Sequence, residues 1–189
     1  MGGYALATQL AQGFDRRLQT GQVGESLIAR WFQKRGYHIL PVYDVEVDTG
    51  KGPRVFVADG QIVAPDLLAF NSEQVYWVEA KHKTAFSWHR ITGQWVTGID
   101  LRHYNDYLRL REISPWPIWL LFLQRGGQAK DSPADSPAGL FGGELKYLSQ
   151  HEHHRHRNWG NQGMVYWAYE TLRPIAPLSE LDSFVAEKR

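Results

Sequence analysis

Two neighbouring apolar segments that carry charged residues constrain this chain more than any other feature. Residues 61–70 contain Asp66, and residues 74–81 end on Glu79 and Lys81. Both segments have the composition of strands, and the three-residue link between them predicts an antiparallel hairpin. Because residues two apart on a strand share a face, Glu79 and Lys81 should lie side by side, within reach of Asp66 on the adjacent strand.

Two carboxylates and one ammonium on one face are costly to bury, which suggests a chemical task. Asp66 and Glu79 can supply the hard oxygen ligands that Mg²⁺ prefers, and the backbone carbonyl of Ala80 is a plausible third ligand. A divalent cation assists phosphodiester hydrolysis by activating water and by neutralising negative charge. Lys81 could stabilise the developing charge or orient the attacking water, and the sequence does not decide between these roles.

A helix is predicted ahead of the two strands. Apolar residues recur at helical spacing from Thr20 onward, and Gly36 is well placed to end the helix. Glu25 lies in its first turns, beside the apolar stripe. A carboxylate there is stabilised by the helix dipole, or it can join the acidic site, and both interpretations remain open.

The remaining elements follow from apolar spacing and from turn residues. They are a weakly specified helix at 4–17, strands at 37–47, 54–57, 118–124 and 164–171, a helix at 99–113, a strand or short helix at 140–148, and a short helix capped by Ser179. Pro41 restricts the strand at 37–47 to an edge or a bulge. Residues 126–139 contain the near-repeat DSPA and predict a flexible loop.

The central residues resemble a known signature. Pro65-Asp66, followed after twelve residues by Glu79-Ala80-Lys81, is similar to the motif of the PD-(D/E)XK nuclease superfamily. Gly24-Glu25 resembles the additional acidic position of its archaeal Holliday-junction-resolvase branch. The resemblance covers residues 20–124 and implies an α/β fold with a restriction-endonuclease-like αβββαβ core, in which helices flank a central mixed sheet.

The same resemblance implies a function. It points to hydrolysis of DNA, less often RNA, with Mg²⁺ or Mn²⁺ as cofactor. Asp66 and Glu79 would be the metal ligands, Lys81 the catalytic lysine, and Glu25 an accessory acid that binds a second cation or a metal-bound water. Related nucleases often pair to cut two strands, so a homodimer is expected.

Length and composition bound the organisation. A chain of 189 residues is expected to form one domain over residues 1–189, with residues 140–189 as an appended extension of strands and a short helix. The lack of cysteine excludes disulfides and thiolate metal sites, and it fits a cytoplasmic protein. Neither a signal peptide nor a membrane span is expected from the apolar runs.

Basic residues gather downstream of the central strands although the net charge is only +1. Four of them are candidates for holding a phosphate backbone, namely Lys83, Arg90, Arg102 and Arg109. The alternative is a solvated surface. Trp88 and Trp95 in the same region could stack on unpaired bases, but at least one is expected to pack in the core.

Residues 150–157, QHEHHRHR, contain four histidines that could bind a transition metal. Their spacings are not those of a closed zinc site, so a solvated or phosphate-facing loop is expected instead.

Two further classes of function compete with a nuclease. One is a non-catalytic nucleic-acid-binding subunit of the same fold in a mobile-element or defence complex, and the other is a structural protein with strand-end ion pairs.

Overall fold

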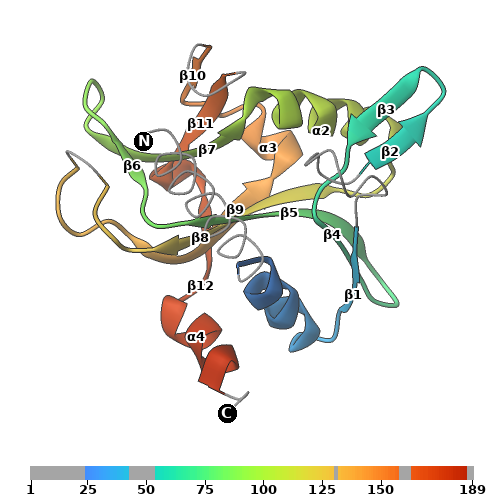
Figure 1. Cartoon of the computed structure of the whole chain (residues 1–189), viewed down its shortest axis with the longest axis horizontal. Coiled ribbons are helices and arrows are strands. Elements are labelled where there is room, and N and C mark those ends of the chain that lie inside the picture. The colour runs from blue at the N-terminus through green and yellow to red at the C-terminus, as the bar shows by residue number, and fades with distance from the viewer. Residues whose placement is uncertain (1–23, 43–53, 130–131, 158–162, 187–189) are drawn as a thin grey trace, which may run out of the picture.

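The computed structural model describes residues 24–42, 54–129, 132–157 and 163–186. Residues 24–33 are helical. The elements after them, in chain order, are β1 (His38–Pro41), β2 (Arg54–Val57), β3 (Gly60–Val63), β4 (Leu67–Phe70), β5 (Val75–Lys83), β6 (Ser87–His89), β7 (Gln94–Asp100), α2 (Leu101–Ile113), β8 (Ile118–Arg125), β9 (Ala138–Glu144), α3 (Leu145–Leu148), β10 (His154–His156), β11 (Met164–Ala168), the 3-10 turn Tyr169–Thr171, β12 (Arg173–Ala176) and α4 (Leu178–Ala186) (Figure 1).

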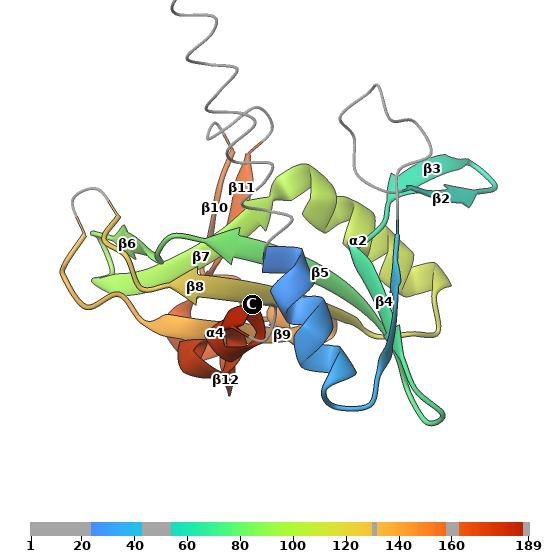
Figure 2. The same cartoon turned by 60° about the horizontal axis from the view of Figure 1, so that its bottom comes forward.

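Six strands form a central sheet in the order β1-β4-β5-β8-β9-β12. β5 and β8 run parallel, and the other neighbouring pairs are antiparallel. The helix over residues 24–33 and α4 lie against one face of this sheet, and α2 lies on the other side (Figure 2). The expected fold class, a mixed sheet flanked by helices, is therefore confirmed.

The order of helix, β1, β4, β5, α2 and β8 is the αβββαβ order expected for the core. Two hairpins interrupt it. The β2–β3 hairpin is inserted between β1 and β4, and β6–β7 lies between β5 and α2. β6 and β7 belong to a second sheet in the order β10-β11-β7-β6. Beyond β8, the strands β9 and β12 extend the central sheet.

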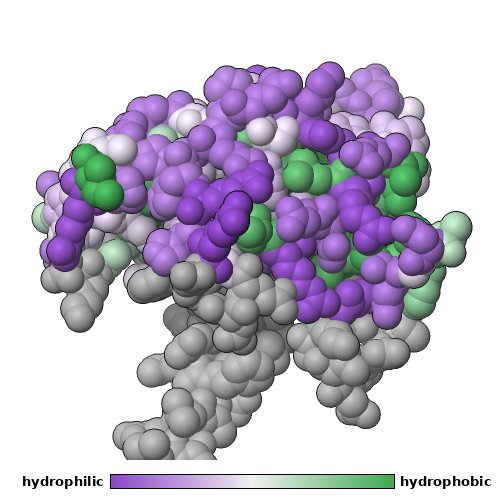
Figure 3. All heavy atoms as spheres, turned by 90° about the horizontal axis from the view of Figure 1, so that it is seen from above, coloured by the Kyte–Doolittle hydropathy of each residue, from purple (hydrophilic) through white to green (hydrophobic). Residues whose placement is uncertain are grey.

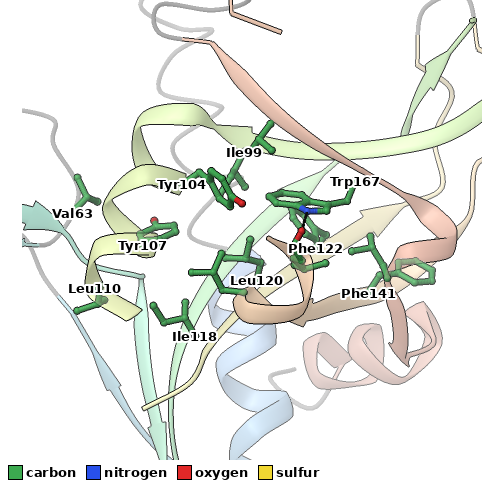
Figure 4. Packing of buried hydrophobic residues seen from close by; sticks show 14 of the residues in the cluster. Val63, Ile99, Tyr104, Tyr107, Leu110, Ile118, Leu120, Phe122, Phe141 and Trp167 are labelled. Atoms are coloured by element: carbon green, nitrogen blue, oxygen red, sulfur yellow. Dashed lines mark hydrogen bonds between the residues drawn. The ribbon is translucent and has the colours of Figure 1, made fainter. Parts of the chain in front are cut away.

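The alternation of side chains along β8 divides the core into two layers. Leu120 and Phe122 pack in the layer that contains α2, and Leu121 and Leu123 pack in the layer that contains residues 24–33. All four are buried, as predicted for a strand covered on both faces. Figure 4 shows the first layer, where Tyr104 and Tyr107 project from α2 toward the sheet and the Trp167 indole N–H donates to the Leu148 carbonyl at 2.8 Å.

The turn between β4 and β5 is held by one side chain. Asn71 Oδ1 accepts the backbone N–H groups of Glu73 at 2.9 Å and Gln74 at 2.8 Å, and the Asn71 N–H donates to the Gln74 carbonyl. Such an Asx turn fixes which residues of the two strands face each other. The pairing runs from Phe70 opposite Val75 to Leu67 opposite Val78, which places Asp66 beside Glu79.

Several predicted boundaries were wrong. The segment expected as one strand at 61–70 is divided into β3 and β4, because Pro65 has no N–H for a ladder and the Val63 N–H donates to the side chain of Asp106 on α2. The strand expected at 164–171 ends at Ala168 and continues as a 3-10 turn. α4 begins at Leu178, so Ser179 lies inside the helix rather than capping it.

Other expectations were correct or partly correct. Pro41 is the last residue of β1, which is an edge strand, and Gly36 ends the first helix with φ +81°. Residues 140–148 form both a strand and a helix, β9 and α3. Within 126–139, β9 already begins at Ala138, and the Ser136 hydroxyl accepts the Phe86 N–H at 3.1 Å. The predicted helix at 4–17, its successor's start at Thr20 and residues 43–47 of the strand expected at 37–47 lie outside the described residues.

The His-rich segment is not only a loop. Its residues 154–156 form β10, which pairs with β11 so that His154 lies opposite Tyr166. This pairing covers an edge of β11 that would otherwise expose unpaired backbone groups.

Among the described residues, no helix has both the length and the apolar character needed to cross a bilayer.

Candidate active site

The structure brings Asp66, Glu79 and Lys81 together on the α2 side of the central sheet. Glu79 and Lys81 are two residues apart on β5, which continues to Lys83, so they lie within the strand and not at its end as expected. Asp66 immediately precedes β4, and its Oδ2 atom accepts the Ala80 N–H at 2.9 Å. Because the strand is interrupted at Pro65, the side chain of Asp66, rather than a backbone carbonyl, accepts the Ala80 N–H of β5.

Glu79 is fully buried and is held by two donors. Its Oε2 accepts the phenol O–H of Tyr107 at 2.6 Å, and its Oε1 forms an ion pair with the Lys81 ammonium. The Lys81 side chain remains 27% exposed, so the pair lies at the edge of the interior. The Glu79 carboxylate is thus held by Lys81 of its own strand and by Tyr107 of α2.

The electrostatics of the site are set first by the burial of its charged groups and then by the crowding of its acids. Burial and then the charge of Glu79 raise the pKa of Asp66 to about 7, although Lys81 and the Ala80 N–H act in the opposite direction. Burial alone would lower the pKa of Lys81, but the charges of Glu79 and Asp66 outweigh it and keep that pKa above its ordinary value. Lys81 is therefore a cation at neutral pH.

Glu25 reaches the same group of charges from the first helix. A Cβ atom on Gly24 would lie 2.5 Å from the His82 Cβ, so only glycine allows the helix to approach β5 this closely. Glu25 is half-buried, and burial followed by the charge of Asp66 raises its pKa, while Lys81 lowers it. The structure therefore places Glu25 within electrostatic range of Asp66 and Lys81.

The four basic residues expected to hold phosphate do not form one cluster. Lys83 lies two residues beyond Lys81 on the same face of β5, and burial followed by the Lys81 charge lowers its pKa. Arg90 lies in the exposed β6–β7 turn, and Arg102 is exposed on the first turn of α2. Arg109 is also exposed, but it pairs with Asp59 at 3.1 Å and so links α2 to the β2–β3 hairpin.

Two residues of the site were missed by sequence reasoning. One is Tyr107, whose hydroxyl bond to Glu79 becomes visible only with the placement of α2. His103 lies one turn earlier on the same helix. Burial and then the charge of Lys81 lower its pKa, and its Nδ1 is buried without a hydrogen-bond partner among the described residues. The i, i+4 spacing of these aromatics was the available signal.

The residues present fit a hard divalent cation. Asp66 and Glu79 crowd two carboxylates into a buried space, and a cation would offset both the burial and the repulsion that raise the pKa of Asp66. No three or more His, Asp or Glu side chains in the described parts of the chain converge enough to enclose a metal. Mg²⁺ does not require this, because it commonly binds one or two carboxylates and keeps several waters.

A separate cavity of about 320 Å³ lies on the opposite side of the sheet. Half of its lining residues are aromatic, among them Trp31, Tyr37, Tyr76 and Trp119. None of the acidic residues described above lines it, so it is not part of the candidate site.

Comparison with known proteins shows a similarity of structure but none of sequence. No known protein family matches the sequence, and no curated protein matches it. Among solved structures, the Holliday junction resolvase Hjc of Archaeoglobus fulgidus is similar to this chain, with a TM-score of 0.47 and 9% identity over 80% of this chain and 90% of that chain. At this level of similarity, neither an activity nor a set of site residues transfers to this chain.

Proposed function

We propose that this protein is a nuclease of the PD-(D/E)XK type that hydrolyses phosphodiester bonds of DNA with Mg²⁺ or Mn²⁺. The observation that carries the proposal is the convergence of Asp66, Glu79 and Lys81 on one face of two adjacent strands within an αβββαβ core. Burial and then the charge of Glu79 raise the pKa of Asp66 to about 7, so ionised Asp66 destabilises the folded protein unless a bound metal cation offsets this cost, which favours a functional site over a structural ion pair.

The residues take distinct roles in this proposal. Asp66, Glu79 and the Ala80 carbonyl would hold the cation, which when bound would activate water and neutralise phosphate charge. Lys81 stabilises negative charge that develops on the phosphate, since its ammonium stays protonated at neutral pH. Tyr107 orients Glu79 through its hydrogen bond. Glu25 would hold a second cation or a water near the first one.

Binding to DNA would involve residues outside this centre. Lys83, Arg90, Arg102 and Arg109 are the candidates for contacts to the phosphate backbone, which would make the affinity depend on salt. We expect DNA as the substrate in preference to RNA, endonucleolytic cutting, a homodimer that acts on two strands, and a cytoplasmic location.

The test is a cleavage assay with plasmid, linear, branched and single-stranded DNA, in Mg²⁺, Mn²⁺ or EDTA. The wild type is compared with Lys81→Ala, Asp66→Asn and Glu79→Gln, and with the controls Asp135→Asn and Glu73→Gln at exposed positions. Cutting that requires metal and is lost only in the first three variants would support the proposal.

The other outcomes identify the alternatives. DNA binding without metal-dependent cutting would indicate a non-catalytic binding subunit. Neither binding nor cutting would indicate a structural role for the ion pairs. Cutting that survives all three substitutions would show that the catalytic centre lies elsewhere.

A further inference from the structure

The turn of the β6–β7 hairpin presents an unusually bare apolar side chain. Ile91 is 90% exposed, more than any other exposed large hydrophobic residue in the described parts of the chain. Isolated apolar residues are common on protein surfaces, and Figure 3 shows small separate hydrophobic groups on a largely hydrophilic face. The exposure of Ile91 alone therefore indicates no function, and the structure of its turn has to be considered as well.

Hydrogen bonds within the turn and from His153 hold the turn in place. Within it, the Gly93 N–H donates to the His89 carbonyl at 2.9 Å, and Thr92 Oγ1 is hydrogen-bonded to His89 Nδ1 at 2.9 Å. From outside, His153 Nε2 lies 3.1 Å from Thr92 Oγ1 and 3.0 Å from Gln94 Oε1. One imidazole next to β10 thus contacts both the turn itself and the first residue of β7.

Ring contacts support the same hairpin. The His89 ring lies 4.8 Å from that of His153 and 4.4 Å from that of His154, and His154 stacks on Tyr166 with an interplanar angle of 4°. The His-rich segment was expected to be a solvated or phosphate-facing loop, but its residues 153 and 154 instead brace the hairpin. Ile91 therefore lies in a turn whose neighbouring residues are fixed by several contacts.

The hairpin is also connected directly to the candidate site. β5 continues from Lys81 through Lys83 toward β6, and β7 returns from Gln94 to Asp100, whose charge acts on Lys83 and His103. The strand from residue 94 to residue 100 spans roughly 20 Å, which is about six base-pair steps of a duplex. Figure 1 shows the hairpin projecting at one end of the molecule, beyond α2.

We propose that the β6–β7 hairpin inserts Ile91 into the base stack of the DNA that is bound at the candidate site. Arg90, the neighbouring residue in the turn, would contact the adjacent phosphate. Apolar side chains that enter a base step must unstack it, and the cost is smallest where pairing is already interrupted. The preferred substrate class is therefore branched, nicked or mismatched DNA, an inference that rests on the proposed function as a DNA nuclease.

The test measures unstacking without cleavage. The full chain in EDTA is mixed with branched and with fully paired DNA that contain 2-aminopurine at successive positions. We expect a rise in fluorescence at one position of the branched DNA, with at least about tenfold tighter binding to branched than to paired DNA. Ile91→Ala and Thr92→Val should abolish the fluorescence rise, Ile91→Phe should retain it, and Ile113→Ala, which alters an exposed isoleucine at the end of α2, should change nothing.

The outcomes separate this inference from the proposed function. If Ile91→Ala unstacks DNA as well as the wild type does, or if no position responds, the insertion is excluded even where metal-dependent cutting is observed. If Ile91-dependent unstacking occurs in a protein that cuts no DNA with any metal, the insertion stands and the nuclease proposal fails. Absence of binding to every DNA would overturn both.

Discussion

Asp66 is ionised in the folded protein only at a cost in stability. Its pKa is raised to about 7 by burial and by Glu79, whereas an aspartate in an unfolded chain titrates near 4. Between these values the folded state binds more protons than the unfolded state. The contribution of Asp66 therefore makes the metal-free protein less stable as the pH rises from about 4 to about 7.

Replacing Asp66 by asparagine should remove this pH dependence. Asp66→Asn can still accept the Ala80 N–H but has no charge, so we expect the free energy of unfolding at pH 7.5 to rise by about 2–4 kcal/mol. Urea denaturation in EDTA at several pH values between 4 and 8 measures it. Asp135→Asn, an exposed position, is the control. An unchanged slope of stability against pH in Asp66→Asn would show that Asp66 titrates normally.

Tyr107 offers a second test at the level of one hydrogen bond. Tyr107→Phe leaves a buried oxygen of Glu79 without that donor, so it should cost about 1–3 kcal/mol of stability. If Glu79 is a metal ligand, its loss of orientation should also weaken metal affinity about tenfold or more. Calorimetric titration with Mn²⁺ and urea denaturation measure the two effects.

The matched control is Tyr104→Phe, one turn earlier on α2. Tyr104 donates to Glu152, which keeps both hydrogen bonds from Arg155, so this change should cost less and leave metal affinity unaltered. Equal effects of the two substitutions would remove Tyr107 from the site.

At the scale of elements, the approach of the first helix to β5 depends on Gly24. Gly24→Ala would place a Cβ 2.5 Å from the His82 Cβ and force the helix away from the strand, which should outweigh the gain of about 1 kcal/mol in helix propensity. We expect a lower melting temperature and weaker metal binding through displacement of Glu25. Ser26→Ala, at an exposed position on the same helix, should be neutral or slightly stabilising. A stabilised Gly24→Ala protein would contradict the close contact.

Elements with strong local signals could be predicted from the sequence, and those that depend on distant partners could not. The apolar run of β8 and the spacing of α2 led to nearly correct boundaries. β10 could not be predicted, because HRH becomes a strand only through pairing with β11. The same distinction holds for the site. Asp66, Glu79 and Lys81 follow from spacing on adjacent strands, whereas Tyr107 and His103 depend on how α2 packs.

At the scale of the whole molecule, α4, the last described helix, completes the core layer that contains residues 24–33. Leu181 and Phe184 of α4 are buried with Leu27 and with other residues of the first helix. Arg30 on that helix donates to the Phe184 carbonyl at 2.6 Å. The two ends of the described chain therefore stabilise one another across the face of the sheet opposite the site.

Removal of α4 should expose this layer. A protein shortened by residues 178–189 loses two buried side chains worth about 1.5–3 kcal/mol each, so we expect a drop of at least about 3 kcal/mol in the free energy of unfolding. Urea denaturation measures the loss, and removal of only residues 187–189 is the control. Equal stability of the two shortened proteins would mean that α4 contributes little to the fold.

The Asx turn at Asn71 determines more than the shape of a hairpin tip. It sets the pairing of β4 with β5, and a shift of one residue in that pairing would reverse the faces of β5. Glu79 and Lys81 would then point into the apolar layer of the first helix, and Ala80 would face α2. Insertions or deletions between residues 71 and 74, at the far end of the strands, can therefore dismantle the site without altering any residue in it.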